Sequence, residues 1–537
     1  MTDHRLRSNG FGWLESRSDR ELRNCFLLGL LLLSVFRFLM LLLLPLDLSG
    51  DEAYYWEWGR HLDWGYVSKP PGIAWIMAGL RVLGADTVFG IRLFSLLLSS
   101  GGLALLFFLG RSMYDARTGL MAALVFALTP ANCALSFLLT IDAPLLLCWT
   151  GAMLGLWRML DSERSEAWSA LILALFLTGG LLSKQMALCF YPLTFLMLLV
   201  CPAYRPVLKS PWFWTALILP LLALLPTLVW NAQHDWVTFS HTSHHFETGS
   251  PTLTVRLVRF FEFLGSGLGL LTPLIGVLMG IVLLAALFRW RSLESRERFL
   301  WVFNGLGLLV LTLLTFRQRI NPNWPAIFVP GGLLLTTAWY FGHWSVGISW
   351  VKRSRWAFRP GLVVALGACV LFYGFILAFS WKVIGRPGLN PVQRLQEWSR
   401  LAGEISALHA AQPDPKKVFF ITQGHRYMTS ELAFYLPGRP QVYPFIRAGH
   451  AAGSQHALWG SPRELKGNDA LIVVYGVDTA LDTQLVELFD EVTLLKEFDL
   501  SQSPSGVSRP TVYLGRNLRN WPNLNPDSTQ TVETEQP

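Results

Sequence analysis

Charged residues are scarce in this chain of 537 residues, where they make up only 15% of the composition. Soluble domains usually carry about 25% charged residues. Hydrophobic residues reach 52%, and leucine-rich runs long enough to cross a bilayer recur along the chain. This composition excludes a single soluble domain and a disordered chain. It predicts a polytopic α-helical membrane protein.

Cysteine and nucleotide-binding motifs are also poorly represented. The six cysteines lie in or beside apolar segments, and none is in a CxxC or Cys/His metal spacing. This pattern excludes a disulfide scaffold and favours small buried core residues. The chain has no glycine-rich phosphate loop and no Asp-x-Asp sequence in a polar region. We therefore expect no nucleotide-sugar site.

Eleven apolar segments predict a membrane domain of about eleven spans, within a range of 11 to 13. The first, Cys25–Leu46, covers about 33 Å at about 1.5 Å per residue, which indicates an uncleaved span. The segment 72–84 is too short to span and is predicted to be an interfacial helix. The other ten predicted spans are 90–110, 117–138, 142–160, 167–183, 185–202, 211–230, 264–289, 299–316, 322–342 and 361–381.

Basic residues predict the orientation. With a cytoplasmic N-terminus, 19 Lys and Arg lie on inside loops and nine on the opposite side. This positive-inside bias places the region after residue 384 outside the cytoplasm, in the periplasm of a bacterium. The basic surplus is confined to the membrane part: residues 385–537 carry 14 basic and 16 acidic residues, against 30 and 20 before them. Nucleic-acid binding is therefore not predicted.

Four regions follow from these patterns. We predict a cytoplasmic N-terminus (1–24), a transmembrane domain (25–384) with an outer loop (47–89), a periplasmic α/β domain (385–520) and a disordered tail (521–537). Within the α/β domain, apolar runs predict strands, and amphipathic runs predict helices. The predicted strands are 418–422 and 470–476, and the predicted helices are 426–436 and 482–490.

The first outer loop carries the densest group of candidate functional residues. Asp51 and Glu52 follow the first span, where a carboxylate can act as a base or orient an acceptor hydroxyl. Lys69 precedes two prolines, which restrict the backbone beside it. Its ammonium group is therefore a well-placed cation for binding a phosphate. Aromatic rings could hold a sugar or an acceptor; the alternative is an interfacial aromatic belt with solvated charges. The candidate rings are Tyr54, Tyr55 and Trp56.

Later outer segments add further candidates. Asp142 begins a span and is predicted to be catalytic, with helix capping as the alternative. Lys184 lies between two apolar runs and is predicted to bind phosphate, with snorkelling as the alternative. Arg317 and Arg319 lie outside against the positive-inside bias, so we expect them to bind a lipid phosphate unless they are merely solvated.

Two other features of the sequence concern buried charge and metal binding. Arg37 lies in the middle of the first span and is expected to face a protein or water-filled interior. A histidine cluster invites a metal site, but its spacing fits no strong motif, so no metal is predicted. The histidines are His234, His241, His244 and His245.

Successive motifs resemble one enzyme family. DEAYYWEW, HLDWGYVSKPPGIAW, IDAPLLLCW, GGLLSKQMAL, LVWNAQHDWVTF and INPNWPA occur in the order found in family 39-type glycosyltransferases, and SELAFYLPGRPQVY is similar to bacterial members. This is the protein O-mannosyltransferase superfamily, with the GT-C fold, and it includes lipid A aminoarabinose transferases. The resemblance covers roughly residues 45–330.

The resemblance implies a GT-C-like fold and a sugar transferred from a polyprenyl-phosphate carrier on the outer side of the membrane, with inversion. It implies that Asp51 is the catalytic carboxylate, with Glu52 beside it. Lys69 matches the Lys-Pro of aminoarabinose transferases, where many other members have His-Pro-Pro. The expected acceptor is lipid A or another cell-surface glycan.

Several alternatives remain. They are a protein O-glycosyltransferase of the same fold, a lipid or sugar transporter, and a binding or scaffold protein. A transporter does not need carboxylates and cations gathered on one face, and a scaffold does not explain Asp51 and Lys69. The expected partners are the lipid-linked donor, a lipid or glycan acceptor and membrane lipids. No cofactor is predicted, and a divalent metal is left open.

Overall fold

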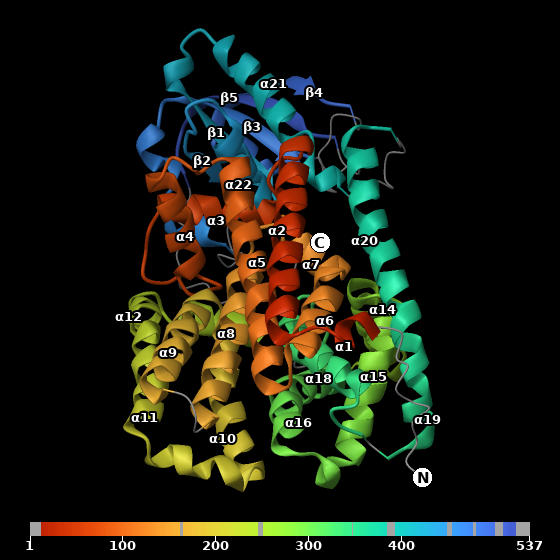
Figure 1. Ribbon diagram of the computed structural model, residues 1–537. Coiled ribbons are helices and arrows are strands. Elements are labelled where there is room, and N and C mark those ends of the chain that lie inside the picture. Colours follow the sequence, from red (N-terminus) through yellow and green to blue (C-terminus); the bar gives the residue numbers. More distant parts are fainter. Residues whose placement is uncertain are drawn as a thin grey trace, which may run out of the picture. The chain divides into compact units, whose positions relative to one another are not determined.

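The computed structural model describes residues 12–161, 165–244, 251–345, 347–383, 392–447, 454–475, 480–499 and 509–521. The chain forms two compact units (Figure 1). The helical unit consists of Met1–Leu41, Arg92–Val229 and Thr242–Tyr373. The sheet unit consists of Leu42–Ile91, Trp230–His241 and Gly374–Pro537.

Most of the helical unit is built from apolar helices. Its helices, some of which continue into the sheet unit, are α1 (Gly12–Glu15), α2 (Asp19–Leu43), α5 (Val88–Met113), α6 (Ala116–Ala127), α7 (Pro130–Leu135), α8 (Asp142–Leu160), α9 (Glu166–Ser183), α10 (Phe190–Val200), α11 (Pro211–Ile218), α12 (Leu225–Gln233), α14 (Leu253–Leu271), α15 (Pro273–Phe288), α16 (Ser295–Leu300), α17 (Leu306–Leu314), α18 (Val329–Phe341), α19 (Ser349–Arg353) and α20 (Phe358–Ser380).

Seven helical stretches within the described residues are long and apolar enough to cross a membrane, or up to nine if two bent pairs each count as one span. The prediction of a polytopic helical membrane protein is confirmed. The count is lower than the predicted eleven because several apolar runs are interrupted. Asn132 belongs to a separate short helix, since Thr129 caps a new start and Pro130 occupies its first position. The predicted span 117–138 is therefore two helices.

The predicted span 264–289 is interrupted as well. The chain bends by 114° between α14 and α15. Thr272 lies at the bend with a φ of 74°, and Pro273 begins the second helix. Hydropathy averaged along the sequence identifies an apolar segment but carries no information on backbone direction. The two helices therefore look like one continuous segment in the sequence.

Close helix packing defines the interior of the helical unit. Figure 1 shows α8 and α9 side by side. At Gly155, a Cβ atom would lie 2.6 Å from the backbone nitrogen of Leu173, so only glycine permits this approach. The apolar core extends from these helices into α5, α6, α15 and α18.

Arg37 belongs to this interior, as the sequence predicts. Its side chain is 1% exposed. The guanidinium donates hydrogen bonds to the hydroxyl of Tyr373 at 3.0 Å, the amide oxygen of Asn132 at 2.9 Å and the carbonyl of Ala127 at 3.1 Å. A fourth, long contact reaches Ser99 Oγ at 3.5 Å. Neutral acceptors thus replace the water that the buried charge loses.

The described residues of the sheet unit form a five-stranded sheet in the order β2-β1-β3-β5-β4. β1 runs parallel to β2 and β3, whereas β5 is antiparallel to β3 and β4. The buried centre lies on β1 and β3, where Phe420 pairs with Leu471. The strands are β1 (Val418–Gly424), β2 (Val442–Pro444), β3 (Asp469–Tyr475), β4 (Phe489–Glu497) and β5 (Thr511–Leu518).

Among the described residues, six α-helices lie wholly or mainly in this unit. They are α3 (Gly50–Arg60), α4 (Gly72–Val82), α13 (Val237–His244, which continues into the helical unit), α21 (Trp398–Ala410), α22 (Arg426–Tyr435) and α23 (Thr483–Val486). In Figure 1, α3 and α4 are red-orange and the strands are blue, although all belong to one unit. The outer loop that carries the candidate residues is therefore part of the same compact unit as the sheet.

The secondary structure predicted for the C-terminal region is largely confirmed. The strand at 418–422, the helix at 426–436 and the strand at 470–476 up to Tyr475 are present, and residue 476 lies outside the described residues. The helix predicted at 482–490 ends at Val486, and β4 begins at Phe489, so its second half is wrong. The segment 72–84 forms the short helix α4; its interfacial position remains a prediction. Residues 522–537 of the predicted disordered tail lie outside the described residues.

Candidate active site

Helix α3 begins with a capping box that fixes its first turn. The hydroxyl of Ser49 accepts from the backbone N–H of Glu52 at 3.3 Å, and the Glu52 carboxylate accepts from the backbone N–H of Ser49 at 2.9 Å. This reciprocal pairing satisfies two backbone donors. Glu52 is consequently buried, and Asp51 stays half-buried at the helix N-terminus, where the helix dipole favours an anion. The two predicted carboxylates therefore have different surroundings: Glu52 caps the helix and is buried, whereas Asp51 is partly exposed. A catalytic role for Glu52 remains a prediction.

A tyrosine from α22 fixes the Asp51 carboxylate. The Tyr427 hydroxyl donates to Asp51 Oδ1 at 3.0 Å. Gly50 makes this contact possible, because a Cβ atom there would lie 2.4 Å from Cγ of the Tyr427 ring. Burial, and then the Asp51 charge, raises the pKa of Tyr427 to about 12. The phenol thus remains a hydrogen-bond donor throughout the neutral range.

Arg426 adds a positive charge beside this pair. Its guanidinium carbon lies 5.4 Å from the Tyr54 ring centroid and 5.0 Å from that of Tyr427, which are cation–π distances. Its Nη2 lies 3.4 Å from the Tyr427 hydroxyl. Burial raises the pKa of Tyr54 to about 12, so its ring remains neutral beneath the cation. Sequence reasoning missed Arg426 and Tyr427, which lie next to one another in the predicted helix at 426–436.

A buried ionic cluster fastens the other end of α3. Glu57 Oε2 accepts from the Ser430 hydroxyl at 2.6 Å and lies 2.8 Å from His456 Nε2. The Glu57 and His456 side chains are at most 1% exposed. Burial disfavours the Glu57 anion, but His456 and Ser430 outweigh this and hold its pKa below the usual value. The helix that carries Asp51 is thereby tied to α22 and to the segment after β2.

The three candidate aromatic residues are buried as packing residues. Tyr54, Tyr55 and Trp56 are 4%, 6% and 2% exposed. Trp56 packs edge-on against Phe434, and the Tyr54 hydroxyl accepts from the backbone N–H of Gln455 at 2.7 Å. These contacts account for the aromatic cluster without a ligand. A sugar-binding role for the three rings remains a prediction.

Lys69 lies in a loop that is pinned from several sides. Its carbonyl accepts from the backbone N–H of Tyr66 at 3.3 Å. The Tyr66 ring stacks on Trp58 with centroids 4.3 Å apart, and its carbonyl accepts from the Thr238 hydroxyl at 2.9 Å. Trp230 Nε1 donates to Asp63 Oδ2 at 2.7 Å. The half-buried lysine therefore belongs to a firmly held loop, as the two prolines after it predict.

Asp142 and Lys184 meet in the helical unit. Lys184 Nζ lies 2.8 Å from Asp142 Oδ1, and Asn323 Nδ2 donates to the other carboxylate oxygen at 2.7 Å. The side chains of Asp142 and Lys184 are 8% and 10% exposed. Asp142 makes no side-chain cap at the start of α8, so the capping alternative is wrong. Their predicted catalytic and phosphate-binding roles remain untested.

The two outer arginines are exposed. Arg319 Nε lies 3.5 Å from Glu262 Oε2, with side chains 57% and 50% exposed. The carbonyl of Arg317 accepts from Arg259 Nη1 at 3.1 Å. An exposed ion pair of this kind contributes little stability. Arg317 and Arg319 belong to the helical unit and Lys69 to the sheet unit, and their shared role in phosphate binding remains a prediction.

The histidine segment shows ordinary packing. His234 stacks on Trp230 with centroids 4.1 Å apart, and its Nδ1 lies 2.8 Å from the Trp230 carbonyl oxygen. Across the described part of the chain, no group of three His, Cys, Asp or Glu residues could hold a metal ion. The side chains of His244 and His245 lie outside the described residues.

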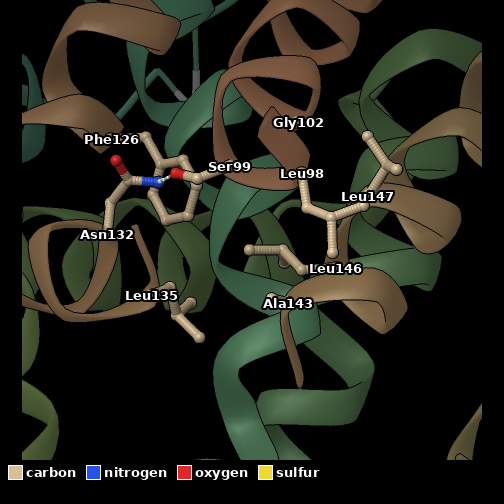
Figure 2. A pocket seen from close by; sticks show the side chains of 9 residues that line it. All are labelled: Leu98, Ser99, Gly102, Phe126, Asn132, Leu135, Ala143, Leu146 and Leu147. Atoms are coloured by element: carbon tan, nitrogen blue, oxygen red, sulfur yellow. Dashed lines mark hydrogen bonds between the residues drawn. The ribbon is translucent and has the colours of Figure 1, made fainter. Parts of the chain in front are cut away.

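A small cavity in the helical unit is separate from the predicted site residues. Figure 2 shows that apolar side chains such as Leu98, Phe126 and Leu146 line most of it. The two polar lining side chains are Ser99 and Asn132, and Asn132 Nδ2 donates to Ser99 Oγ at 3.3 Å. Both residues also bind Arg37. The cavity thus borders the network that satisfies the buried arginine.

Comparison with known proteins agrees with this architecture. Residues 68–230 match the family described as dolichyl-phosphate-mannose-protein mannosyltransferase. This range begins just before Lys69 and includes Asp142 and Lys184. The fold is GT-C-like, as the motifs predict.

The structure resembles apo ArnT from Cupriavidus metallidurans with a TM-score of 0.60, at 14% identity over 92% of this chain and 98% of ArnT. It also resembles ArnT bound to undecaprenyl phosphate, with a TM-score of 0.59 at 15% identity over 91% and 97% of the two chains. The sequence is 27% identical over 326 residues to the lipid A galacturonosyltransferase RgtD of Rhizobium johnstonii, strain DSM 114642 / LMG 32736 / 3841. That alignment covers 60% of this chain and 65% of RgtD.

Proposed function

We propose that this multi-pass membrane protein is an inverting glycosyltransferase of the bacterial inner membrane. It moves a sugar from a polyprenyl-phosphate carrier to lipid A, or to another cell-surface glycan, on the periplasmic side. The observation that carries the proposal is Asp51: a half-buried carboxylate at a helix N-terminus, fixed by Tyr427 at 3.0 Å.

This arrangement suits direct displacement at the anomeric carbon. Asp51 orients the acceptor hydroxyl and takes its proton while the acceptor oxygen bonds to the anomeric carbon. The bond from that carbon to the carrier phosphate breaks, and the phosphate leaves with the electron pair. Lys69 stabilises the departing charge, and a single displacement inverts the configuration. Where the acceptor is a phosphate, Asp51 mainly positions it.

The similarities support the donor and the acceptor. RgtD acts on lipid A, and ArnT has been solved with undecaprenyl phosphate. The Lys-Pro-Pro sequence at Lys69 resembles the lipid A type. The family matched over residues 68–230 is named for protein mannosylation, which makes a protein acceptor the alternative outcome.

The test uses the purified full chain in detergent with a polyprenyl-phosphate sugar donor. Mass spectrometry of lipid A, surface glycans and proteins from a deletion strain identifies the sugar and acceptor to supply. Transfer from the lipid donor to lipid A or glycan supports the proposal. Transfer only to protein, or efficient transfer from a nucleotide sugar after all lipid carriers are removed, refutes it.

Asp51→Asn keeps the shape of the side chain and removes its charge. A general base at this position predicts a rate loss of at least about 10²-fold. Asp414→Asn is the matched control, because Asp414 is exposed and lies 3.5 Å from Lys417 on the surface of the same unit. Near-normal turnover of folded Asp51→Asn removes this residue from the chemical step.

The periplasmic orientation rests on the basic residues, with 19 on the inside loops and nine outside. A reporter fused after Trp381 is expected to be active only outside the cytoplasm. Cytoplasmic activity at this position overturns the orientation and, with it, the side on which Asp51 works.

A further inference from the structure

Arg426 lies beside the proposed catalytic carboxylate and has donors to spare. Nη2 makes a 3.4 Å contact with the Tyr427 hydroxyl. Nε is buried and has no acceptor within the described part of the chain.

The position of this charge is tied to Asp51 through one phenol oxygen. The Tyr427 hydroxyl is 3.0 Å from Asp51 Oδ1 and 3.4 Å from Arg426 Nη2. The rings of Tyr54 and Tyr427 hold the guanidinium at 5.4 and 5.0 Å, which limits where it can move. In the proposed reaction, the anomeric carbon of the donor sugar lies beside Asp51. The Arg426 guanidinium then lies within about one pyranose ring of that carbon.

We propose that Arg426 makes the site selective for a sugar bearing a carboxylate, a uronic acid, over a neutral or amino sugar. The inference rests on the proposed function and adds the substrate class. A guanidinium with unused N–H groups binds a carboxylate through paired, charge-assisted hydrogen bonds. Near Asp51 alone, a cationic sugar is favoured; Arg426 reverses that preference by repelling an ammonium group and attracting an acid.

A simpler role is that Arg426 only balances the Asp51 charge. The two roles differ in what changes on substitution. A balancing charge affects transfer of every sugar alike, whereas a specificity residue changes the ratio between an acidic sugar and its neutral counterpart. The ratio therefore decides between them.

The experiment compares two polyprenyl-phosphate donors that differ at one position, galacturonosyl and galactosyl, with aminoarabinosyl as the cationic probe. The purified full chain is supplied with the same acceptor each time, and kcat/KM is measured. We expect the galacturonosyl donor to be preferred over the galactosyl donor by at least about 10-fold and the aminoarabinosyl donor to be used least. A contact of about 1.5–3 kcal/mol corresponds to about 10–100-fold.

Arg426→Gln is expected to lower the ratio of acidic to neutral transfer by about 10–100-fold, and Arg426→Lys to restore part of it. Arg447→Gln is the matched control, since Arg447 is 56% exposed and pairs with Asp482 in the same unit. An unchanged ratio in Arg426→Gln overturns the inference. So does a wild-type preference for the neutral or cationic donor, which requires no variant to fold.

The outcomes also separate this inference from the proposed function. Efficient transfer of a neutral or amino sugar from the lipid carrier retains the proposed function and rejects the acidic specificity. Failure to use any lipid-linked sugar, with activity towards a nucleotide sugar, rejects both.

Discussion

Lys184 and Asp142 form a buried ion pair, with Nζ 2.8 Å from Oδ1, although they come from the ends of different helices of the apolar unit. Asn323 donates to the second carboxylate oxygen at 2.7 Å. The charges of Asp142 and Lys184, which belong to separate sequence motifs, therefore neutralise each other. Asn323, from a third motif, supplies the hydrogen bond to the remaining carboxylate oxygen. The pair explains how both charges are accommodated where neither alone could be.

The losses of stability caused by removing each partner should not be additive. We expect Asp142→Asn or Lys184→Met alone to lower the unfolding free energy by about 3–5 kcal/mol, because each leaves a buried charge unpaired. The double variant should lose less than the sum of the two. Glu262→Gln breaks the exposed pair with Arg319 and should cost about 0–1 kcal/mol. Thermal and denaturant unfolding in detergent measures all four.

Additive losses in this cycle would mean that the two side chains do not interact in the folded protein. The same variants separate stability from substrate binding. If Lys184 also grips the donor phosphate, Lys184→Met raises the KM for the lipid donor in the fraction that remains folded, whereas a purely structural pair leaves that KM unchanged.

Lys69→Ala should reduce initial rates by about 10–100-fold at subsaturating donor, since it removes one charge-assisted phosphate contact of about 1.5–3 kcal/mol. Lys69→Arg should recover only part, because a planar fork does not reproduce a point charge. Lys382→Ala is a suitable control, since Lys382 is 67% exposed and pairs with Glu397. Initial rate against donor concentration checks this. Equal small effects at Lys69 and Lys382 would contradict the phosphate assignment.

Alanine substitution of Arg317 and Arg319 tests whether these outer arginines bind phosphate, and it needs a control arginine that does not contact them. Arg259 is unsuitable, because its Nη1 donates to the carbonyl of Arg317 at 3.1 Å. Arg256, whose Nε donates to the carbonyl of Pro251 at 3.0 Å, is the better comparison. Arg317→Ala or Arg319→Ala with a larger effect than Arg256→Ala would support phosphate binding by these exposed residues.

Glu57→Gln should destabilise the sheet unit by about 3–5 kcal/mol, because it removes the charge from a fully buried pair with His456. The melting temperature should fall, and turnover should fall with it because α3 carries Asp51. Glu491→Gln on the exposed face of β4 serves as the control. Melting curves and rates measured on the same samples check the link. A normal melting temperature with lost turnover would instead point to direct participation of Glu57 in the reaction.

His425 should make the sheet unit less stable in acid. Burial, and then the nearby Arg426 and Arg394, lowers the pKa of His425 from 6.5 to about 4 in the folded chain. The unfolded chain binds the proton near pH 6.5, so between pH 6.5 and 4 it holds more protons and stability falls as the pH falls. His425 Nδ1 also accepts from the backbone N–H of Tyr427 at 3.4 Å and caps α22.

His425→Asn keeps a capping acceptor and removes the titration. The melting temperature of this variant should change less between pH 6.5 and 4 than that of the parent chain. An identical pH dependence in the two proteins would assign the acid sensitivity to other groups.

The sequence predicted the elements that depend on local pattern. β1, β3 and α22 have apolar runs of the right period and length, and they formed as expected. β4 was misread because its apolar residues continue directly from the short helix α23, without a turn signal between Val486 and Phe489. Local pattern does not reveal where a short helix gives way to an edge strand.

The candidate site shows the same division. Asp51 and Lys69 stand out as charges within an aromatic and proline-rich loop. The residues beside Asp51 cannot be read in this way, since Tyr427 and Arg426 lie in an ordinary amphipathic helix whose contact with α3 exists only in the folded chain. The burial of Tyr54 and Trp56 was equally invisible, because an aromatic cluster has the same composition at a surface and in a core.

The contact between Tyr427 and Asp51 also sets an order of events during synthesis. The two residues are 376 positions apart. At about 5–20 residues per second, roughly 20–75 s pass between the emergence of Asp51 and that of its partner. Throughout this time α3 has its own capping box but neither Tyr427 nor the Ser430 and His456 that hold Glu57. A ribosome that stops before β1 therefore leaves a membrane-inserted chain without the partners that hold its carboxylate. The proposed reactive centre would then be among the last parts of the protein to be assembled.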